Sequence, residues 1–152
     1  MNASARIFTV GHSNRSLDAL VALLRAAGVQ AVADVRRFPR SRRWPWFDRA
    51  ALEAALPAQG LAYRWLGDAL GGYARPPYPA YVHTPAFAQG LARLEALARA
   101  APLAVLCAER DWRHCHRRFI ADALCRRGWA VVHLLDPDHR EPHPCPLPGS
   151  QP

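Results

Sequence analysis

Residues 103–107, Leu-Ala-Val-Leu-Cys, form a short and uninterrupted apolar run. Such a run is typical of a central parallel strand, because helices cover both faces of that strand. The residues that follow, 108–113, are mostly polar, and a helical pattern then extends over 114–127 and ends at Gly128. The run therefore predicts a strand followed by a loop and a helix, which is the repeating unit of an α/β protein.

The same alternation continues on both sides of this run. Further strands are predicted over 6–10, 30–35, 61–66 and 129–135, and further helices over 17–27, 49–56 and 85–100. Ser16 and the pair Thr84-Pro85 are strong signals for helix starts. We therefore expect an α/β fold, a three-layer αβα single domain over residues 1–135 with a five-stranded, mostly parallel sheet. Residues 136–152 contain six prolines and are expected to form a proline-rich C-terminal tail.

The composition sets limits on partners and location. The net charge of +8 comes from 20 basic residues, all of them arginine. A basic protein attracts polyanions, but a bias spread over the whole chain indicates no particular partner unless the arginines cluster. There is no signal peptide pattern and no apolar run of about 20 residues. We expect a cytoplasmic protein without membrane contact, whose cysteines are reduced thiols. The four cysteines are Cys107, Cys115, Cys125 and Cys145.

Polar residues follow three of the predicted strands. These triplets are Gly11-His12-Ser13, Asp34-Val35-Arg36 and Cys107-Ala108-Glu109. In parallel sheets, ligands bind beyond the carboxyl ends of the strands, so we expect the three triplets to line one site. Amides after Gly11 are placed to hold an anion, and His12 is suited to proton transfer. The plainer alternatives are a strand-to-helix turn at Gly11 and an ion pair between Asp34 and Arg36.

Residues 36–47 are predicted to be a loop, because they carry two prolines and five arginines without periodicity. Arginines interleaved with aromatic side chains suit a polyanion with stackable bases. The alternative is that Trp44, Trp46 and Phe47 simply cover the core.

Residues 107–117 carry the densest chemistry. Cys107 and Arg113 have the C-x5-R spacing of phosphatase loops, but the bulky and acidic residues between them argue against that mechanism. Cys107, His114, Cys115 and His116 suggest a metal site, but they lack the paired spacing of structural zinc ligands. We favour Glu109 as a general acid/base or an orienting carboxylate. Arg117 and helix-terminal amides would then hold an anion, and Cys107 would be a small packed residue.

These motifs resemble the family known as domain of unknown function 488. The resemblance rests on ordered motifs at Thr9-Val-Gly-His-Ser13, Asp34-Val-Arg-Arg-Phe-Pro-Arg-Ser41, Phe47, Leu70-Gly-Gly72, Cys107-Ala-Glu109 and Cys115-His-Arg117, spread over about residues 6–135. The family name carries no reaction. The resemblance implies that the motifs converge, as the strand-end argument also predicts.

The sequence therefore predicts an enzyme with an anion-binding pocket, hydrolytic in type, acting on a phosphate-bearing small molecule or nucleic acid by general acid/base chemistry. The expected catalytic residues are His12, Asp34, Glu109 and His116. The expected anion-binding residues are Gly11, Ser13, Arg36, Ser41, Gly71, Gly72, Tyr73, Cys107 and Arg117. We predict no cofactor. A nucleic-acid-binding module that uses residues 36–47 and a Cys/His metal-binding protein remain as alternatives.

One geometric expectation is specific. If the second and fourth strands flank the first, Arg36 and Arg117 both reach its carboxyl end. They would then form a single positive pocket with the amides after Gly11.

Overall fold

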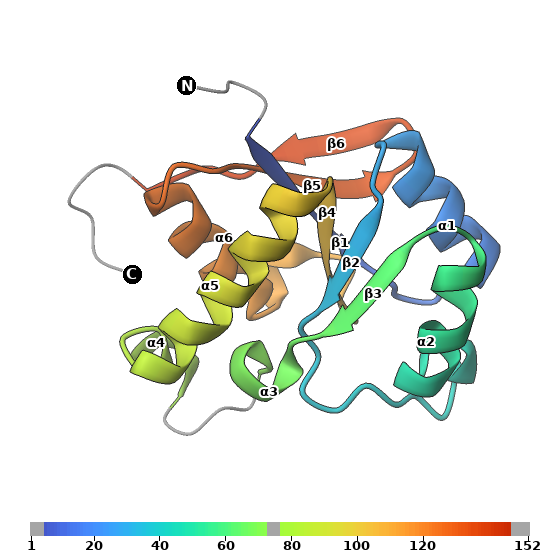
Figure 1. Ribbon diagram of the computed structural model, residues 1–152, viewed down its shortest axis with the longest axis horizontal. Coiled ribbons are helices and arrows are strands. Elements are labelled where there is room, and N and C mark those ends of the chain that lie inside the picture. The colour runs from blue at the N-terminus through green and yellow to red at the C-terminus, as the bar shows by residue number, and fades with distance from the viewer. Residues whose placement is uncertain (1–4, 73–76, 147–152) are drawn as a thin grey trace.

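A computed structural model describes residues 5–72 and 77–146 of the chain, and a six-stranded sheet forms its centre (Figure 1). In chain order the strands are β1 (Arg6–Gly11), β2 (Ala31–Asp34), β3 (Ala62–Trp65), β4 (Leu103–Cys107), β5 (Ala130–Asp136) and β6 (His139–Pro142). The spatial order is β3-β2-β4-β1-β5-β6. The first five of these are parallel to their neighbours, whereas β6 pairs antiparallel with β5.

The helices lie on both faces of this sheet, which confirms the predicted αβα architecture. The described helices are α1 (Leu17–Ala26), α2 (Arg49–Ala58), α3 (Gly67–Leu70), α4 (Tyr78–Tyr81), α5 (Pro85–Ala100) and α6 (Arg117–Arg126), with short 3-10 turns at Pro45–Phe47 and Trp112–His114. In Figure 1, α1 and α2 lie to one side of the sheet, and α5 and α6 lie to the other.

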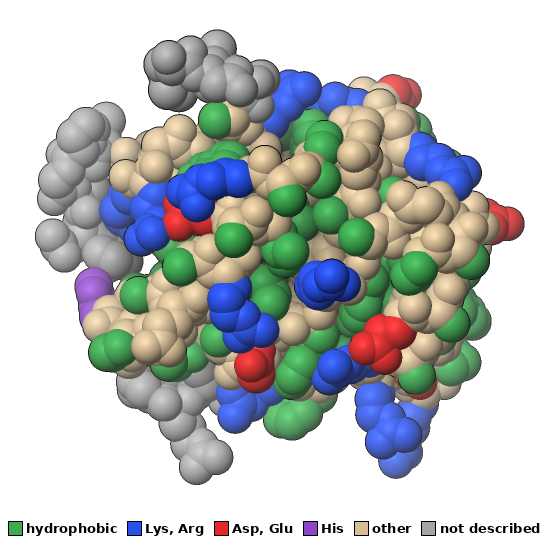
Figure 2. Space-filling view, viewed as in Figure 1, with side chains coloured by type: hydrophobic (Ala, Val, Ile, Leu, Met, Phe, Trp, Pro, Cys, Tyr) green, Lys and Arg blue, Asp and Glu red, His purple; other side chains and the backbone are tan. Residues whose placement is uncertain are grey.

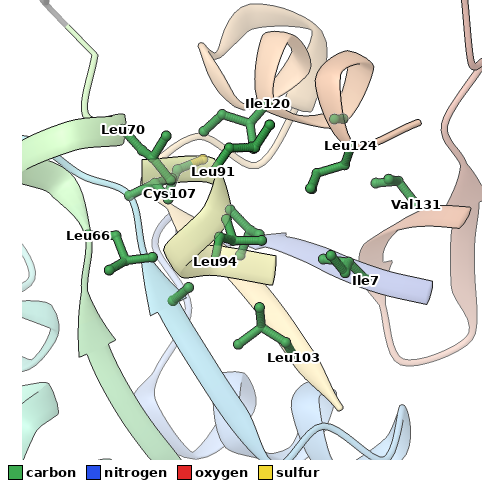
Figure 3. Packing of buried hydrophobic residues seen from close by; sticks show 14 of the residues in the cluster. Ile7, Leu66, Leu70, Leu91, Leu94, Leu103, Cys107, Ile120, Leu124 and Val131 are labelled. Carbon is green, nitrogen blue, oxygen red and sulfur yellow. The ribbon is translucent and has the colours of Figure 1, made fainter. Parts of the chain in front are cut away.

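Each face of the sheet has its own apolar core, because side chains alternate along every strand. One core contains Ile7, Leu94, Leu103 and Leu124 from strands and from α5 and α6 (Figure 3). The other contains Val10 and Leu106 from the strands, together with residues of α1 and α2. The central strand β4 is buried along its whole length, as the apolar run of its sequence predicts.

The predicted helix starts are confirmed where side-chain caps were expected. The Ser16 hydroxyl accepts a hydrogen bond from the Ala19 amide, and the Thr84 hydroxyl accepts one from the Phe87 amide. The helix predicted over 114–127 instead begins at Arg117, because residues 112–114 first form a 3-10 turn. The Asp111 carboxylate caps that turn by accepting the Arg113 amide.

The prediction of five strands differs from the structure by one. The additional strand β6 lies within the segment that we expected to be a tail, and it forms a hairpin with β5 through pairs such as His133 with Glu141.

The expectation of four reduced cysteines was also wrong for two of them. Cys125 in α6 and Cys145 form a disulfide with a Cα–Cα distance of 5.5 Å, and this bond ties the segment after β6 to α6.

A buried chain of polar groups, here named the histidine cluster, links Thr9, His133, His143 and Asp122. The His143 Nε2–H donates to Asp122 over 2.6 Å, and His133 Nε2 lies 2.9 Å from His143 Nδ1. The Thr9 hydroxyl donates to the remaining ring nitrogen of His133. Every ring nitrogen of the two histidines thereby has a hydrogen-bond partner.

The Trp112 ring stacks on His133 at a centroid distance of 4.4 Å and covers this cluster. Burial, together with the positive charge of Arg117, lowers the pKa of His133 to about 2. The 3-10 turn that carries Trp112 is thus anchored against β5.

Within the described residues, every helix is too short or too polar to span a bilayer.

Candidate functional site

The parallel register brings the three predicted triplets to one edge of the sheet. Gly11 lies beside Cys107 at the ends of β1 and β4, and Asp34 lies beside Leu106 at the ends of β2 and β4. The central position of β4 therefore places the Cys107-Ala108-Glu109 segment between the other two. Glu109 and Asp34 lie at the ends of adjacent strands, as the convergence of the motifs requires.

A cleft of about 760 Å³ opens at this edge. Its lining comes from the strand ends, from residues 36–44 and from the segment that precedes α6. The lining residues are His12, Arg36, Arg37, Phe38, Arg40, Ser41, Trp44, Gly72, Cys107, Ala108, Glu109, His114, Cys115 and His116. Three arginines and one carboxylate among these residues give the cleft an excess of positive charge.

Asp34 and Arg36 form a buried ion pair at one wall of this cleft. Arg36 donates to Asp34 through Nε over 2.9 Å and through Nη2 over 2.7 Å, and its backbone amide also donates to Oδ1. The Tyr63 hydroxyl donates to Asp34 Oδ2. Burial, and then the adjacent carboxylate charge, raise the pKa of Tyr63, which therefore stays protonated as a donor. We call Asp34, Arg36, Tyr63 and His12 the cleft cluster. Its hydrogen bonds fix the Arg36 guanidinium in one orientation.

His12 completes the cleft cluster as a neutral acceptor. Arg36 Nη1 lies 3.3 Å from His12 Nε2, and since arginine only donates, Nε2 must accept. The proton is then on Nδ1, which donates to the Ser13 carbonyl over 2.9 Å. Burial lowers the pKa of His12 to about 4, and the charge of Arg36 also lowers it. Both ring nitrogens of His12 are thus engaged in hydrogen bonds, and its ring stacks on Phe47.

The Glu109 side chain is exposed, whereas that of Asp34 is buried. Glu109 lines the cleft, and its side chain has no hydrogen-bond partner among the described residues. Its backbone is held closely, because a Cβ placed on Gly11 would lie 1.8 Å from the Glu109 carbonyl oxygen. Only glycine at position 11 allows this approach. Among the residues that line the cleft, Glu109 is the acidic one.

Two thiols meet at the floor of the cleft. The Sγ atoms of Cys107 and Cys115 are 3.0 Å apart. Cys107 is buried, and Cys115 is half-buried. His116 Nε2–H donates to the Val35 carbonyl over 2.9 Å, which turns Nδ1 toward Cys115 Sγ at 3.6 Å. His116 therefore lies in the predicted site, paired with a thiol.

Arg117 occupies a different place from the one we expected. It is 1% exposed and does not belong to the cleft lining. Its Nη2 donates to the Arg110 carbonyl, whereas Nε and Nη1 have no partner among the described residues. The strand order also differs from the assumed one, because β4 and β5 flank β1, whereas β2 lies beyond β4. Arg36 lines the cleft, whereas Arg117 is buried and its charge acts on both thiols.

The amides after Gly11 are also engaged elsewhere. The His12 amide donates to the Cys107 carbonyl, and the Ser13 amide donates to the Ala108 carbonyl. Ser13 has a positive φ of 49°, which turns the chain at this point. These bonds join the β1 and β4 loops, so the amides hold the site together and are not available to an anion.

Of the remaining predicted residues, Ser41 and Gly72 line the cleft, whereas Gly71 does not belong to its lining. The Ser41 hydroxyl accepts a hydrogen bond from the Trp44 amide and stabilises the turn between these two residues. Gly71 packs against Arg37, and Gly72 lies against His116, where a Cβ would be 3.1 Å from Nδ1. Tyr73 lies outside the described residues.

Several lining residues were not assigned to the site from sequence. Arg37, Arg40 and Trp44 were considered only for a nucleic-acid loop, and Cys115 only as a metal ligand. The sequence feature that could have indicated them is that each lies within a few residues of one that was assigned to the site. Among the described residues, no group of three or more His, Cys, Asp or Glu side chains is arranged to hold a metal ion.

The family model described as domain of unknown function DUF488 matches residues 16–124. This span is most of the 152 residues, so the chain belongs to that family. No curated protein and no solved structure matches the chain significantly.

Proposed function

We propose that this member of the DUF488 family is an enzyme that binds a phosphate-bearing substrate, a nucleotide or a nucleic acid, in the cleft and hydrolyses it by general acid/base chemistry. The observation that carries the proposal is the charge distribution of the cleft wall. Arg36, Arg37 and Arg40 line it, and Glu109 is its acidic lining residue. Arginine binds phosphate oxygens through a planar fork of donors, which makes a phosphate group the natural ligand.

Arg36 supports the proposal because its orientation is fixed before any ligand binds. Asp34 holds two of its donor atoms and His12 a third, and the side chain is only 7% exposed. A ligand that contacts it does not pay the entropy of ordering a long side chain. Arg40 is exposed and contributes a further positive charge to the cleft lining.

Glu109 supports catalysis over simple binding. A carboxylate among arginines weakens phosphate binding, so a pure binder gains nothing from it. As a general base, it takes a proton from water while the water oxygen bonds to phosphorus and the leaving oxygen departs.

One observation favours a second candidate, a nucleic-acid-binding module. Phe38 is 68% exposed and Trp46 is 39% exposed, in the same loop as the exposed Arg42 and Arg43. Exposed rings beside arginines suit base stacking along a single strand. Against it, Figure 2 shows basic side chains scattered over the visible face rather than gathered into one stripe.

The experiment compares binding and turnover in matched variants. Mononucleotides and a short single-stranded oligonucleotide are titrated at fixed salt against the wild type, Arg40→Ala and Arg42→Ala. Arg42 is the control, because it lies in the same loop outside the cleft lining. We expect Arg40→Ala to weaken mononucleotide binding about tenfold or more, since a charge-assisted contact contributes about 1.5–3 kcal/mol.

Phosphate release is measured in parallel for the wild type and Glu109→Gln. We expect Glu109→Gln to bind at least as tightly as the wild type and to lose turnover. Equal losses of oligonucleotide binding in Arg40→Ala and Arg42→Ala, without any turnover in the wild type, would replace the enzyme by the binding module.

A further inference from the structure

We propose that Cys115 and Cys107 form a redox-active dithiol, in which Cys115 exchanges with a small disulfide carrying carboxylate groups and Cys107 resolves the mixed disulfide. The inference goes beyond the proposed hydrolysis, which uses neither thiol. It rests on the contact between the two sulfur atoms, which are 3.0 Å apart at the floor of the cleft.

The geometry permits a bond between these sulfurs with a small movement. A disulfide has an S–S distance of about 2.05 Å, so the sulfurs need to approach by about 1 Å. Cys107 is the last residue of β4, and Cys115 lies between the 3-10 turn and α6.

Cys115 has the surroundings of an attacking thiolate. Its Sγ accepts the Arg117 backbone amide over 3.4 Å, and His116 Nδ1 lies 3.6 Å away. The Cys107 S–H, then the His116 ring and the Arg117 charge, lower the pKa of Cys115. The buried guanidinium of Arg117, with Nε and Nη1 unpaired among the described residues, is a fixed countercharge for this sulfur. The thiolate is the nucleophilic form of cysteine.

Cys107 has the opposite properties and therefore the opposite role. It is 1% exposed, and burial raises its pKa, so it stays a protonated thiol beneath Cys115. An external disulfide cannot reach it before Cys115. Once Cys115 carries the mixed disulfide, Cys107 is the nearest thiol to its sulfur.

The thiol–disulfide exchange proceeds in two steps. The Cys115 thiolate attacks one sulfur of the external disulfide RSSR, an S–S bond forms to Cys115, and RS⁻ leaves. The Cys107 sulfur then attacks Cys115 Sγ, the second RS⁻ leaves, and the Cys107 proton passes to one of the two released thiolates. One protein thiolate and one protein thiol are oxidised to a disulfide, and RSSR is reduced to one thiol and one thiolate, which takes up a proton from water.

The cleft selects the charge of the external disulfide. Arg36, Arg37 and Arg40 line the approach to Cys115, and a volume of about 760 Å³ is within the range that holds a small-molecule ligand. Carboxylates pair with these arginines, whereas an ammonium-bearing disulfide is repelled.

Oxidised glutathione, which carries carboxylates, and cystamine, which carries amines, serve as the probes. The reduced cleft thiols are exposed to each, and peptide mass spectrometry follows the Cys107–Cys115 link with the Cys125–Cys145 disulfide as an internal reference. We expect the wild type to form the link, Cys107→Ser to stop at a glutathione adduct on Cys115, and Cys115→Ser not to react. Cystamine should react at least about tenfold more slowly, beyond its intrinsic reactivity toward free cysteine.

Thermal unfolding of each variant verifies that it is folded. An identical, unresolved adduct in the wild type and in Cys107→Ser would overturn the resolving role. Equal corrected rates with cystamine would overturn the substrate class, and an unreactive Cys115 in the folded wild type would overturn the proposal itself. Nucleotide binding by Cys115→Ser is measured separately, and its retention shows that the two proposals stand or fall independently.

Discussion

The cleft cluster and the histidine cluster are both buried, both contain histidines with lowered pKa values, and both begin on a strand of the same sheet. The two clusters differ in the residue at the end of each hydrogen-bonded chain. The cleft cluster ends at Arg36, which lines a cleft, whereas the histidine cluster ends at Asp122 and is covered by Trp112. A perturbed histidine therefore does not by itself indicate a reactive site. The cluster that presents a charge to an open cleft is the functional candidate.

The clusters also differ in how much charge they bury. Asp34 and Arg36 have side chains that are 0% and 7% exposed, whereas Asp122 is 27% exposed and pairs with an imidazole. Removing the buried carboxylate leaves a guanidinium without its partner, which is costly in a medium of low dielectric.

The largest expected effect comes from Asp34→Ala. We expect the free energy of unfolding to fall by about 3–5 kcal/mol, because Arg36 and the Tyr63 hydroxyl both lose their acceptor. Urea denaturation at neutral pH measures the change. A loss below about 1 kcal/mol would mean that water replaces the carboxylate, and that the cleft cluster is no more tightly coupled than a surface pair.

The next effect is a dependence of stability on pH. The pKa of His12 is lowered by burial from 6.5 to about 4, so between these values the unfolded chain binds a proton that the folded chain does not. The unfolding free energy therefore falls as pH decreases from 6.5 to 4, by about 3 kcal/mol from His12. His133 acts in the same direction down to a pKa of about 2.

Denaturation curves at several pH values compare the wild type with His12→Gln and His133→Gln. Below pH 6.5, the ordinary pKa of histidine, the unfolding free energy of both variants should decline less steeply than that of the wild type. Parallel curves for all three proteins would contradict the neutral state assigned to these rings.

The smallest effect is expected from Asp122→Asn at the other cluster. The His143 Nε2–H keeps an acceptor but loses the charge on it, which should lower stability by about 1 kcal/mol. Calorimetry measures the shift in Tm, and nucleotide titration should be unchanged. A change in nucleotide affinity would show that the two clusters are coupled and would remove the distinction between them.

Much of the fold could be predicted from local patterns. The apolar run of β4 and the caps at Ser16 and Thr84 are properties of a few neighbouring residues, and a parallel sheet follows from their alternation with helices. The convergence of Gly11, Asp34 and Glu109 follows in turn, because parallel strands share a carboxyl edge. The strand β6 could not be foreseen, since His-Arg-Glu-Pro has the composition of a tail and becomes a strand only by pairing with β5.

The inner arrangement of the site depended on long-range packing. Arg36 lines the cleft although β2 is not a neighbour of β1, whereas Arg117 is buried with its Nη2 on the Arg110 carbonyl. A single sequence does not specify this packing. The contact between Cys107 and Cys115 depends on the 3-10 turn anchored by Trp112 against His133. Spacing alone suggested a phosphatase loop or metal ligands for these cysteines. It could not show that His133 of β5 packs against Trp112 and so holds the turn between the two cysteines.

The short strand β6 has a consequence for how this protein behaves in concentrated solution. It forms one edge of the sheet, and an unprotected edge is a template for a strand of another chain. Here the edge is four residues long, carries the exposed Arg140 and ends in Pro142, which has no amide proton to offer. The opposite edge, β3, is equally short and exposes Arg64. Both borders of the sheet thus disfavour edge-to-edge aggregation.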